Sequence, residues 1–171
     1  MEIETDNLVI RSFSSDDIDD YASIVADPEV MRYLGDTVDS DSAAEYVADC
    51  IIRDQTSGIS RYAVTERSDG KFIGFCGFKS LTGDYGNQVP EGTPWIDFGW
   101  RYRRSAWRKG FGFEAASAVY EYGKRQLDLS NIEARAHGDN IGSLRIIEKL
   151  GFQWMHDYES PVGVFRRYRE A

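Results

Sequence analysis

Residues 107–115 read WRKGFGFEA: a tryptophan and two basic residues, two glycines two positions apart, and a glutamate close behind. The stretch lies between a strand-like segment, 95–102, and a segment with helical periodicity that begins near Gly110. The N–H groups at the start of a helix lack partners within the helix and can bind an anion. Glycine has no Cβ, so a ligand can approach the main chain closely. The stretch predicts either an anion-binding turn or a solvated basic turn whose glycines serve packing.

The charge of this region is opposite to that of the whole chain. Five of the nine residues 101–109 are Arg or Lys, whereas the 171-residue chain has a net charge of −9. A local positive charge favours a polyanion such as a pyrophosphate. The net negative charge of the chain argues against nucleic acid as the main partner, because a protein that binds the phosphate backbone needs a broad positive face. It would instead weakly steer cationic substrates such as amines toward the protein.

Known nucleotide-binding motifs fit 107–115 poorly. A P-loop needs Lys-Ser or Lys-Thr directly after its second glycine, whereas here Phe113-Glu114 follows Gly112. A dinucleotide fingerprint usually has a third glycine where Ala115 stands, and although alanine is sometimes accepted there, the fingerprint follows an early strand, whereas this stretch lies late in the chain. The stretch alone therefore does not distinguish a ligand site from a packed turn.

The composition predicts one folded domain over residues 1–171. It is 42% hydrophobic and 13% aromatic, typical of a globular chain. The N-terminus has no signal-peptide pattern, and no apolar run approaches the ~20 residues of a membrane span, so we expect a cytoplasmic protein without a membrane partner. Cys50 and Cys76 are expected to be buried free thiols. His137 and His156 fit no metal-site spacing, and no metal is expected.

The hydrophobic pattern predicts a mixed sheet with helices on its faces. The expected strands are 8–13, 61–66, 71–81, 95–102, 131–137, 153–159 and 162–169. The expected helices are 14–25, a short piece at 29–34, one opened by a capping box at 42–45, one from about Gly110, and one from Asn140. A polar loop, 82–94, separates the third and fourth strands and is long enough to suggest a functional role.

Two further motifs flank the opening stretch. IDFGW (96–100) precedes it, and NIGSLRIIEKLGF (140–152) follows the next predicted strand. In order and spacing, the three motifs resemble the GNAT superfamily of acyl-CoA-dependent N-acyltransferases. The likeness is greatest to the RimJ/RimL-like branch, which acetylates the N-termini of ribosomal proteins. The opening LVIRSFSSDD (8–17) also matches that branch, so the resemblance spans nearly the whole chain.

The resemblance implies an α/β (α+β) GNAT fold: one mixed, mostly antiparallel twisted sheet of about seven strands, splayed between strands four and five. It implies acetyl-CoA as co-substrate, with its pantetheine arm in the gap between residues 96–102 and 131–137. The main-chain groups of Trp100, Arg101 and Tyr102 would bind the pantetheine amides. The residues around the pyrophosphate would be Arg108, Lys109, Gly110, Phe111, Gly112 and Phe113. Arg103, Arg104 and Lys109 are candidates for phosphate contacts, the alternative for each being a solvated side chain.

The resemblance also implies direct attack of a neutral amine on the thioester. A thiol leaving group has a pKa of about 8.5, so a nearby hydroxyl donor helps it leave. The superfamily often has a tyrosine for this role where Ile147 stands here, and the RimJ/RimL-like branch nominates Ser143 instead. Without the resemblance, Ser143 would be a first-turn helix serine and Asn140 an N-cap. In the family, Asn140 would touch the pantetheine arm or a bound water.

Two residues are candidates for the general base. Asp97 matches the acidic position of the fourth strand, and His137 ends the fifth strand. The alternatives are a carboxylate paired with an arginine for Asp97 and a polar strand-end residue for His137. At pH 7.5 an α-amine is roughly a third neutral and a lysine only about 0.1% neutral. An α-amine acceptor therefore needs less help from a base.

The acceptor is left open by the sequence. A protein N-terminus, an antibiotic or other small amine, and a polyamine are all compatible, and 14–56 and 82–94 are expected to line the acceptor side. The chain could be a monomer or a homodimer. The alternative function is a non-catalytic acyl-CoA-binding sensor or scaffold with the same fold. The missing tyrosine favours that alternative, whereas Ser143 and Asp97 argue against it.

Overall fold

The computed structural model describes residues 1–82 and 94–171, so the loop predicted at 82–94 lies, apart from its two end residues, outside the described residues. The strands are β1 (Glu2–Glu4), β2 (Leu8–Arg11), β3 (Arg61–Glu66), β4 (Phe72–Thr82), β5 (Pro94–Tyr102), β6 (Ile132–His137), β7 (Gln153–Ser160) and β8 (Gly163–Arg169). The helices are α1 (Ile18–Val25), α2 (Pro28–Met31), α3 (Ser40–Ser57), α4 (Phe111–Arg125) and α5 (Ile141–Lys149). Short 3-10 turns at Ser15–Asp17 and Arg104–Ala106 precede α1 and α4.

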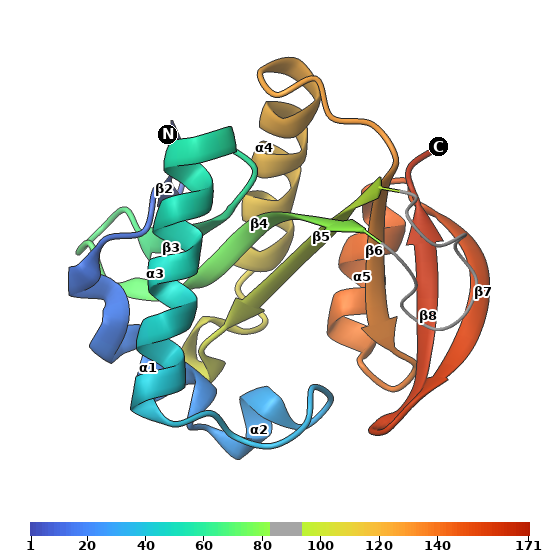
Figure 1. Ribbon diagram of the computed structural model, residues 1–171, viewed down its shortest axis with the longest axis horizontal. Helices are drawn as coiled ribbons and strands as arrows, with labels where there is room; N and C mark the ends of the chain where they lie inside the picture. The colour runs from blue at the N-terminus through green and yellow to red at the C-terminus, as the bar shows by residue number, and fades with distance from the viewer. Residues whose placement is uncertain (83–93) are drawn as a thin grey trace.

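The described strands form one sheet in the order β1-β2-β3-β4-β5-β6-β8-β7 (Figure 1). Neighbouring strands are antiparallel except for β5 and β6, which are parallel. The mixed, mostly antiparallel fold is therefore confirmed, with eight described strands where about seven were predicted. The additional strand is β1, whose three residues pair with β2. Three residues are too few for an alternating pattern to be visible in the sequence.

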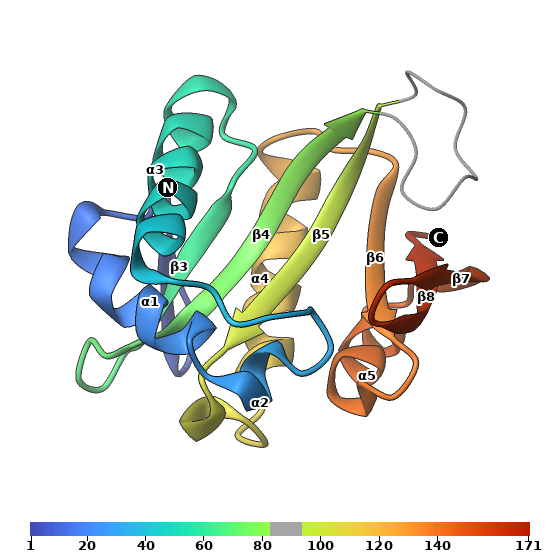
Figure 2. The same ribbon diagram turned by 60° about the horizontal axis from the view of Figure 1, so that its bottom comes forward.

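The sheet splits between β5 and β6. Their pairing covers three positions only, Ile96–Phe98 against 132–134. Beyond these, β5 continues along β4 as far as Tyr102, and β6 continues along β8 as far as His137. Figures 1 and 2 show the two strands meeting at one end and diverging toward the other. The splay predicted between these two strands is thus present, and it opens after Phe98.

One face of the sheet is covered by α4 and α5. The side of α4 that faces the sheet carries small and apolar residues: Ala116, Val119 and Gly123 are all buried. A Cβ at Gly123 would lie 2.4 Å from the Phe78 ring, so the absence of a side chain lets α4 approach β4 closely. The main core cluster therefore lies between these two helices and the sheet.

The other face is covered by α1, α2 and α3, which pack a second core cluster against Phe72 and Phe75 of β4. Figure 2 shows α1 and α3 beside β3 and β4, with α2 on the way toward β6 and α5. Helices thus lie on both faces, as expected. None of the helices in the described parts of the chain is both long and apolar enough to cross a membrane.

The capping box predicted at 42–45 is wrong. Helix α3 begins two residues earlier, at Ser40, and the Asp39 carboxylate accepts the Ser42 N–H at 2.8 Å. Asp39 is therefore the N-cap, because its carboxylate reaches the third N–H of the helix. In the same way Asp27 caps the short α2, whose helical residues end at Met31 instead of continuing to residue 34.

Candidate active site

The turn before α4 holds two residues in the left-handed conformation. Gly110, the N-cap residue of α4, has φ 88°, and Arg108 has φ 61°. A Cβ at Gly110 would meet nothing within 4 Å, so glycine here serves the backbone conformation and not the available space. The helix itself begins at Phe111, one residue after the predicted start.

Five consecutive N–H groups at this turn, those of residues 108–112, have no hydrogen-bond acceptor among the described residues. The Trp107 N–H before them donates within its own turn at 3.0 Å. The N–H groups of Phe113 and Glu114 both donate to the Gly110 carbonyl at 3.1 Å. Since the positive end of the α4 dipole lies here, the turn can bind an anion. Residues 108–112 therefore have the local structure that the first interpretation of 107–115 requires.

Three arginines at the end of β5 and just after it extend toward α1 and α2. Their side-chain partners are Tyr21 for Arg101 (3.3 Å), Asp20 for Arg103 (2.6 Å) and Asp27 for Arg104 (2.6 Å). Two of the basic residues that suggested a polyanion site are thus ion-paired across the α1–α2 face. Phosphate contacts by Arg103 and Arg104 would require these ion pairs to be exchanged, and they stay a prediction.

The remaining basic side chains of the turn are more exposed. Arg108 is exposed and makes no ion pair with any described residue. Lys109 Nζ lies 3.8 Å from a Glu66 carboxylate oxygen and 5.5 Å from the centre of the Phe111 ring. These two side chains are the ones that could reach a phosphate without breaking a close ion pair.

Gly112 serves packing in this structure. A Cβ at Gly112 would lie 2.8 Å from Ile146 of α5 and 3.4 Å from the Tyr102 ring. The absent side chain therefore allows α4, α5 and β5 to meet, and close approach of a ligand at Gly112 stays a prediction. The Tyr102 carbonyl, one of the expected pantetheine contacts, accepts a hydrogen bond from Trp107 Nε1 at 2.8 Å.

Glu114, the last charged residue of 107–115, holds the turn between β1 and β2 against α4. Its carboxylate accepts hydrogen bonds from the Thr5 hydroxyl (2.6 Å), the Asn7 N–H (2.8 Å) and the Asn7 side-chain amide (3.0 Å). Burial raises the pKa of Glu114, but these hydrogen bonds outweigh it and leave the pKa below its usual value. A glutamate in the first turn of a helix was the only sequence signal for this role.

Helix α5 brings Ser143 to the mouth of the split. The Asn140 side chain caps the helix by accepting the Ser143 N–H at 3.1 Å. The Ser143 hydroxyl accepts a hydrogen bond from Trp100 Nε1 at 3.3 Å. Trp100 belongs to the part of β5 that has left β6, so this bond joins the two sides of the gap. Ile147, at the position of the expected tyrosine, is fully buried in the core.

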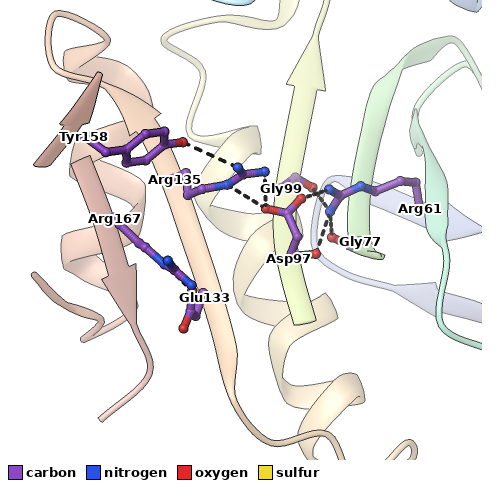
Figure 3. Close-up of polar contacts among 8 residues, drawn as sticks. All are labelled: Arg61, Gly77, Asp97, Gly99, Glu133, Arg135, Tyr158 and Arg167. Atoms are coloured by element: carbon purple, nitrogen blue, oxygen red, sulfur yellow. Dashed lines mark hydrogen bonds and ion pairs between the residues drawn. The ribbon is translucent and has the colours of Figure 1, made fainter. Parts of the chain in front are cut away.

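On the opposite face of the sheet, Asp97 lies between two arginines (Figure 3). Arg61 of β3 donates to the Asp97 carboxylate and to the carbonyl of Gly77. Arg135 of β6 donates to the other carboxylate oxygen through Nε at 3.2 Å and Nη2 at 3.1 Å. The remaining nitrogen of Arg135 donates to the Tyr158 hydroxyl at 3.4 Å. Asp97 thus links strands on both sides of β5.

Two opposing effects determine the pKa of Asp97. Burial alone would raise it, but the charges of Arg61 and Arg135 and their hydrogen bonds lower the pKa below its ordinary value. An ionised carboxylate held in this way is a weak base. The pairing with arginine that the sequence left open is therefore present, and the general-base role of Asp97 stays a prediction.

His137 packs between aromatic side chains at the end of β6. Its ring stacks on Tyr33 with 4.9 Å between centroids and meets Phe165 edge-on at 5.6 Å. Nδ1 accepts the Asp139 N–H at 3.1 Å, and the Cβ position of Gly163 lies 2.4 Å from Nε2. Tyr33 follows α2, so this stack links the first half of the chain to the far side of the split. A base role for His137 also stays a prediction.

Glu133, the register partner of Asp97 on β6, was not identified from the sequence. It is fully buried and is paired with two arginines of β8. Arg169 donates through Nε at 3.0 Å and Nη2 at 2.7 Å, and Arg167 donates through Nε. A glutamate between Ile132 and Ala134 in a buried strand was the signal, since such a charge needs a partner.

Both cysteines are buried and form no disulfide, which confirms the free-thiol prediction. Burial raises the pKa of Cys50 to about 11 and that of Cys76 to about 12. Neither thiol is therefore a ready nucleophile. In the described parts of the chain, no group of three His, Cys, Asp or Glu side chains is arranged to hold a metal ion.

Solved structures with the same fold include GNAT acetyltransferases. A GNAT-family acetyltransferase from Bacillus anthracis superposes with a TM-score of 0.82 at 22% identity, over 99% of this chain and 97% of that one. RimL, a ribosomal L7/L12 α-N-protein acetyltransferase in complex with coenzyme A, superposes with a TM-score of 0.79 at 12% identity, over 99% and 97% of the two chains. Likeness at these identities shows the fold alone, so membership of the RimJ/RimL-like branch stays a prediction.

Sequence comparison gives the family. The uncharacterized N-acetyltransferase p20 of Bacillus licheniformis is 27% identical over 167 residues, which cover 93% of this chain and 88% of that protein. The model of the acetyltransferase (GNAT) domain matches residues 7–153, most of the chain. The chain therefore belongs to the GNAT acetyltransferase family.

Proposed function

We propose that this protein transfers an acetyl group from acetyl-CoA to a primary amine, by direct attack within a ternary complex. The observation that carries the proposal is the split after Phe98, with Trp100 and Ser143 hydrogen-bonded across its mouth. The 108–112 N–H groups lie at the start of α4, a few residues beyond the end of β5. An extended thioester with a diphosphate at its far end matches this combination of a gap and an anion site.

The donor would bind largely to main-chain groups. Past Phe98, β5 has no strand partner on its β6 side among the described residues, so it can pair with an extended chain that carries amides. The pantetheine arm is such a chain, and it would lie against Trp100, Arg101 and Tyr102. Its pyrophosphate would receive the 108–112 N–H groups at the positive end of α4.

Ser143 is the proposed proton donor to the leaving group. Trp100 Nε1 can only donate, so its bond to Ser143 uses an acceptor site of the hydroxyl and leaves the hydroxyl hydrogen available. Acetyl-CoA supplies the thioester carbonyl: the amine nitrogen bonds to that carbon, the carbon–sulfur bond breaks, and free coenzyme A leaves. The sulfur takes a proton from Ser143, and the proton lost by the amine restores the Ser143 hydroxyl, passed on through water or a base. The products are the N-acetylated amine and the CoA thiol.

Two residues are candidates for the general base that takes the proton from the amine. Asp97 is held ionised by two arginines, which weakens it as a base, and His137 is packed between Tyr33 and Phe165. Both stay candidates, acting directly or through water. An α-amine, roughly a third neutral at pH 7.5, suits such a site better than a lysine side chain does.

The test is thiol release from acetyl-CoA with a panel of amines. The panel comprises amino acids, small amines without a carboxylate, a polyamine, a lysine-containing peptide and a ribosomal-protein N-terminal peptide. We expect at least one α-amine to release CoA well above the rate of hydrolysis, with the acetylated product seen by mass spectrometry. If acetyl-CoA binds tightly and no amine releases CoA, the non-catalytic acyl-CoA sensor replaces the enzyme as the better interpretation.

A further inference from the structure

Three arginines gather on the sheet face that carries Asp97. Arg61 and Arg135 share the Asp97 carboxylate, as described above. Arg61 and Arg101 share the ring of Phe75, with their guanidinium carbons 5.8 and 5.6 Å from its centre. We call Arg61, Arg101 and Arg135 the three-arginine cluster. It lies on the face covered by α1, where β5 and β6 part.

Among the described residues, the cluster has more guanidinium groups than carboxylates. Arg61 and Arg135 share the Asp97 carboxylate there, in a chain whose net charge is −9. Arg101 has no carboxylate within ion-pair distance among the described residues. Its Nη1 donates to the Tyr21 hydroxyl, and its Nε is buried without a hydrogen-bond partner in the described chain. Arg101 therefore has the charge and the spare donors to bind an anion.

The position of Arg101 relates this anion site to the reacting centre. Arg101 follows Trp100 on the splayed end of β5, and successive side chains of a strand point to opposite faces. Trp100 contacts Ser143 on one face, and Arg101 contacts Tyr21 on the other. An anion on Arg101 would thus lie on the α1 face, about one strand residue from the thioester proposed beside Trp100.

We infer that the acceptor carries a carboxylate a few bonds from the amine that is acetylated, and that the Arg101 side chain binds this carboxylate. The inference rests on the proposed function and names its substrate class. The shared chemistry is an amine with a nearby carboxylate, supplied by a free amino-acid-like molecule or by a peptide whose N-terminal residues are acidic.

Two neighbouring features fit such an acceptor. The Tyr21 hydroxyl accepts from Arg101 and retains its own hydrogen, so it can donate to the same carboxylate. Burial raises the pKa of Tyr21 to about 12, which keeps this hydrogen in place at neutral pH. The positive cluster also disfavours an ammonium group beside it, so the bound amine loses its proton more readily. This effect compensates in part for the weak base at Asp97.

The experiment compares closely related acceptors with and without the carboxylate. CoA release is measured with L-phenylalanine, L-phenylalaninamide and phenethylamine. A second pair consists of two peptides that begin Ala-Glu-Glu and Ala-Gln-Gln, which separates the peptide source from the small-molecule source. We expect kcat/KM to be at least about tenfold higher with the carboxylate in one of the two sets, because a charged group would otherwise lose its partner. The amide has the more weakly basic amine, so a site indifferent to the carboxylate would prefer it.

Variants then assign the preference to Arg101. Arg101→Gln should remove the preference mainly through KM, while the KM for acetyl-CoA stays near that of the wild type. Arg101→Lys keeps the charge without the planar fork and should retain part of the preference, and it also serves if the glutamine variant folds poorly. Arg166→Gln is the matched control, because Arg166 is an exposed arginine on β8 without an ion pair in the described chain. It should keep the full preference.

The outcomes separate the inference from the function on which it rests. If the acceptors without the carboxylate are acetylated as well as, or better than, their carboxylate counterparts in both sets, the inference is wrong and the proposed function stands. A carboxylate preference that survives in Arg101→Gln also overturns the assignment. If no amine releases CoA, the proposed function fails, and the inference fails with it.

Discussion

Asp97 and Glu133 stand opposite each other in the short paired part of β5 and β6, and each carboxylate is shared by two arginines. Figure 3 draws both arginines of Asp97 and one of the two at Glu133, Arg167. The two networks differ in where their arginines come from. Asp97 takes one from β3 and one from β6, so its network crosses β5 and reaches both sides of the split. The arginines of Glu133 both come from β8, on one side of the split. The same chemistry therefore joins the two halves of the sheet in one case and stabilises a single half in the other.

Burial adds to this contrast. Glu133 and Arg167 are 0% and 1% exposed, whereas the side chains of Arg61 and Arg135 are 10% and 16% exposed. A charge left alone in a buried site cannot regain water, so its isolation is costly. We expect substitutions at Glu133 to act on stability alone. At Asp97 they should act on stability and on the site together.

The largest effect is expected for Glu133→Gln. The substitution leaves the buried Arg167 without a counter-ion, and it should lower the free energy of unfolding by about 3–5 kcal/mol. Denaturant unfolding measures this loss, and the KM values of the folded enzyme should stay close to those of the wild type. Glu148→Gln, at an exposed position of α5, is the control and should change stability by less than about 0.5 kcal/mol. A loss below about 1 kcal/mol at Glu133 would contradict the comparison.

Asp97→Asn should be somewhat less destabilising, by about 2 kcal/mol, and its effect should depend on pH. The folded-state pKa of Asp97 is lowered, so its contribution is present above the unfolded pKa of about 4 and is lost as pH falls through the lower folded value. The difference in unfolding free energy between wild type and variant should therefore shrink below about pH 4. Denaturant unfolding at several pH values between about 2.5 and 7 measures this difference.

The same variant separates the two roles of Asp97. If the carboxylate positions Arg61 and Arg135, Asp97→Asn should alter the acceptor KM and leave the shape of the kcat/KM profile between about pH 6 and 9 unchanged. If Asp97 is the general base, the variant should lose kcat and its pH profile should change. A changed profile with an unchanged acceptor KM would restore the base role.

The residues of these two networks show which features could be predicted from the sequence and which could not. Local patterns identified every described strand except β1, and the family motifs around Gly110 and Ser143. They indicated the split between β5 and β6 because a known family shares those motifs. Partners far apart in the chain were not visible: Arg61 is 36 residues from Asp97, and Arg167 is 34 residues from Glu133. A single sequence does not show which distant arginine meets which carboxylate.

The basic run 101–109 illustrates the same limit. Its local charge suggested a polyanion, but Arg103 and Arg104 pair with Asp20 and Asp27, 83 and 77 residues away. Arg101, to which the sequence assigned a main-chain role, has no carboxylate partner among the described residues, and neither has the exposed Arg108. A cluster of like charges in a sequence thus predicts a local potential, and long-range packing decides which of its members are neutralised.

Ser143→Ala probes the donor side of the split, away from both carboxylate networks. Losing the hydroxyl donor should lower kcat at least about tenfold, because the leaving thiolate then departs without a positioned proton. The affinity for acetyl-CoA should change little, since the main chain and the 108–112 N–H groups are retained. Steady-state kinetics and acetyl-CoA titration give the two values. Ser130→Ala, at an exposed position before β6, is the control, and equal turnover in the two variants would remove Ser143 from the mechanism.

The smallest effect is expected for Glu114→Gln, a carboxylate held by neutral donors instead of arginines. The variant retains the shape of the side chain but loses the charge that strengthens the hydrogen bonds from Thr5 and Asn7 and suits the N-terminus of α4. The unfolding free energy should fall by about 1 kcal/mol, whereas Glu121→Gln, exposed on the same helix, should have almost no effect. Acetyl-CoA affinity should stay the same, because Glu114 faces the turn between β1 and β2. A large loss of acetyl-CoA binding would instead mean that this glutamate maintains the 108–112 turn, and the donor site would then depend on a carboxylate far from the split.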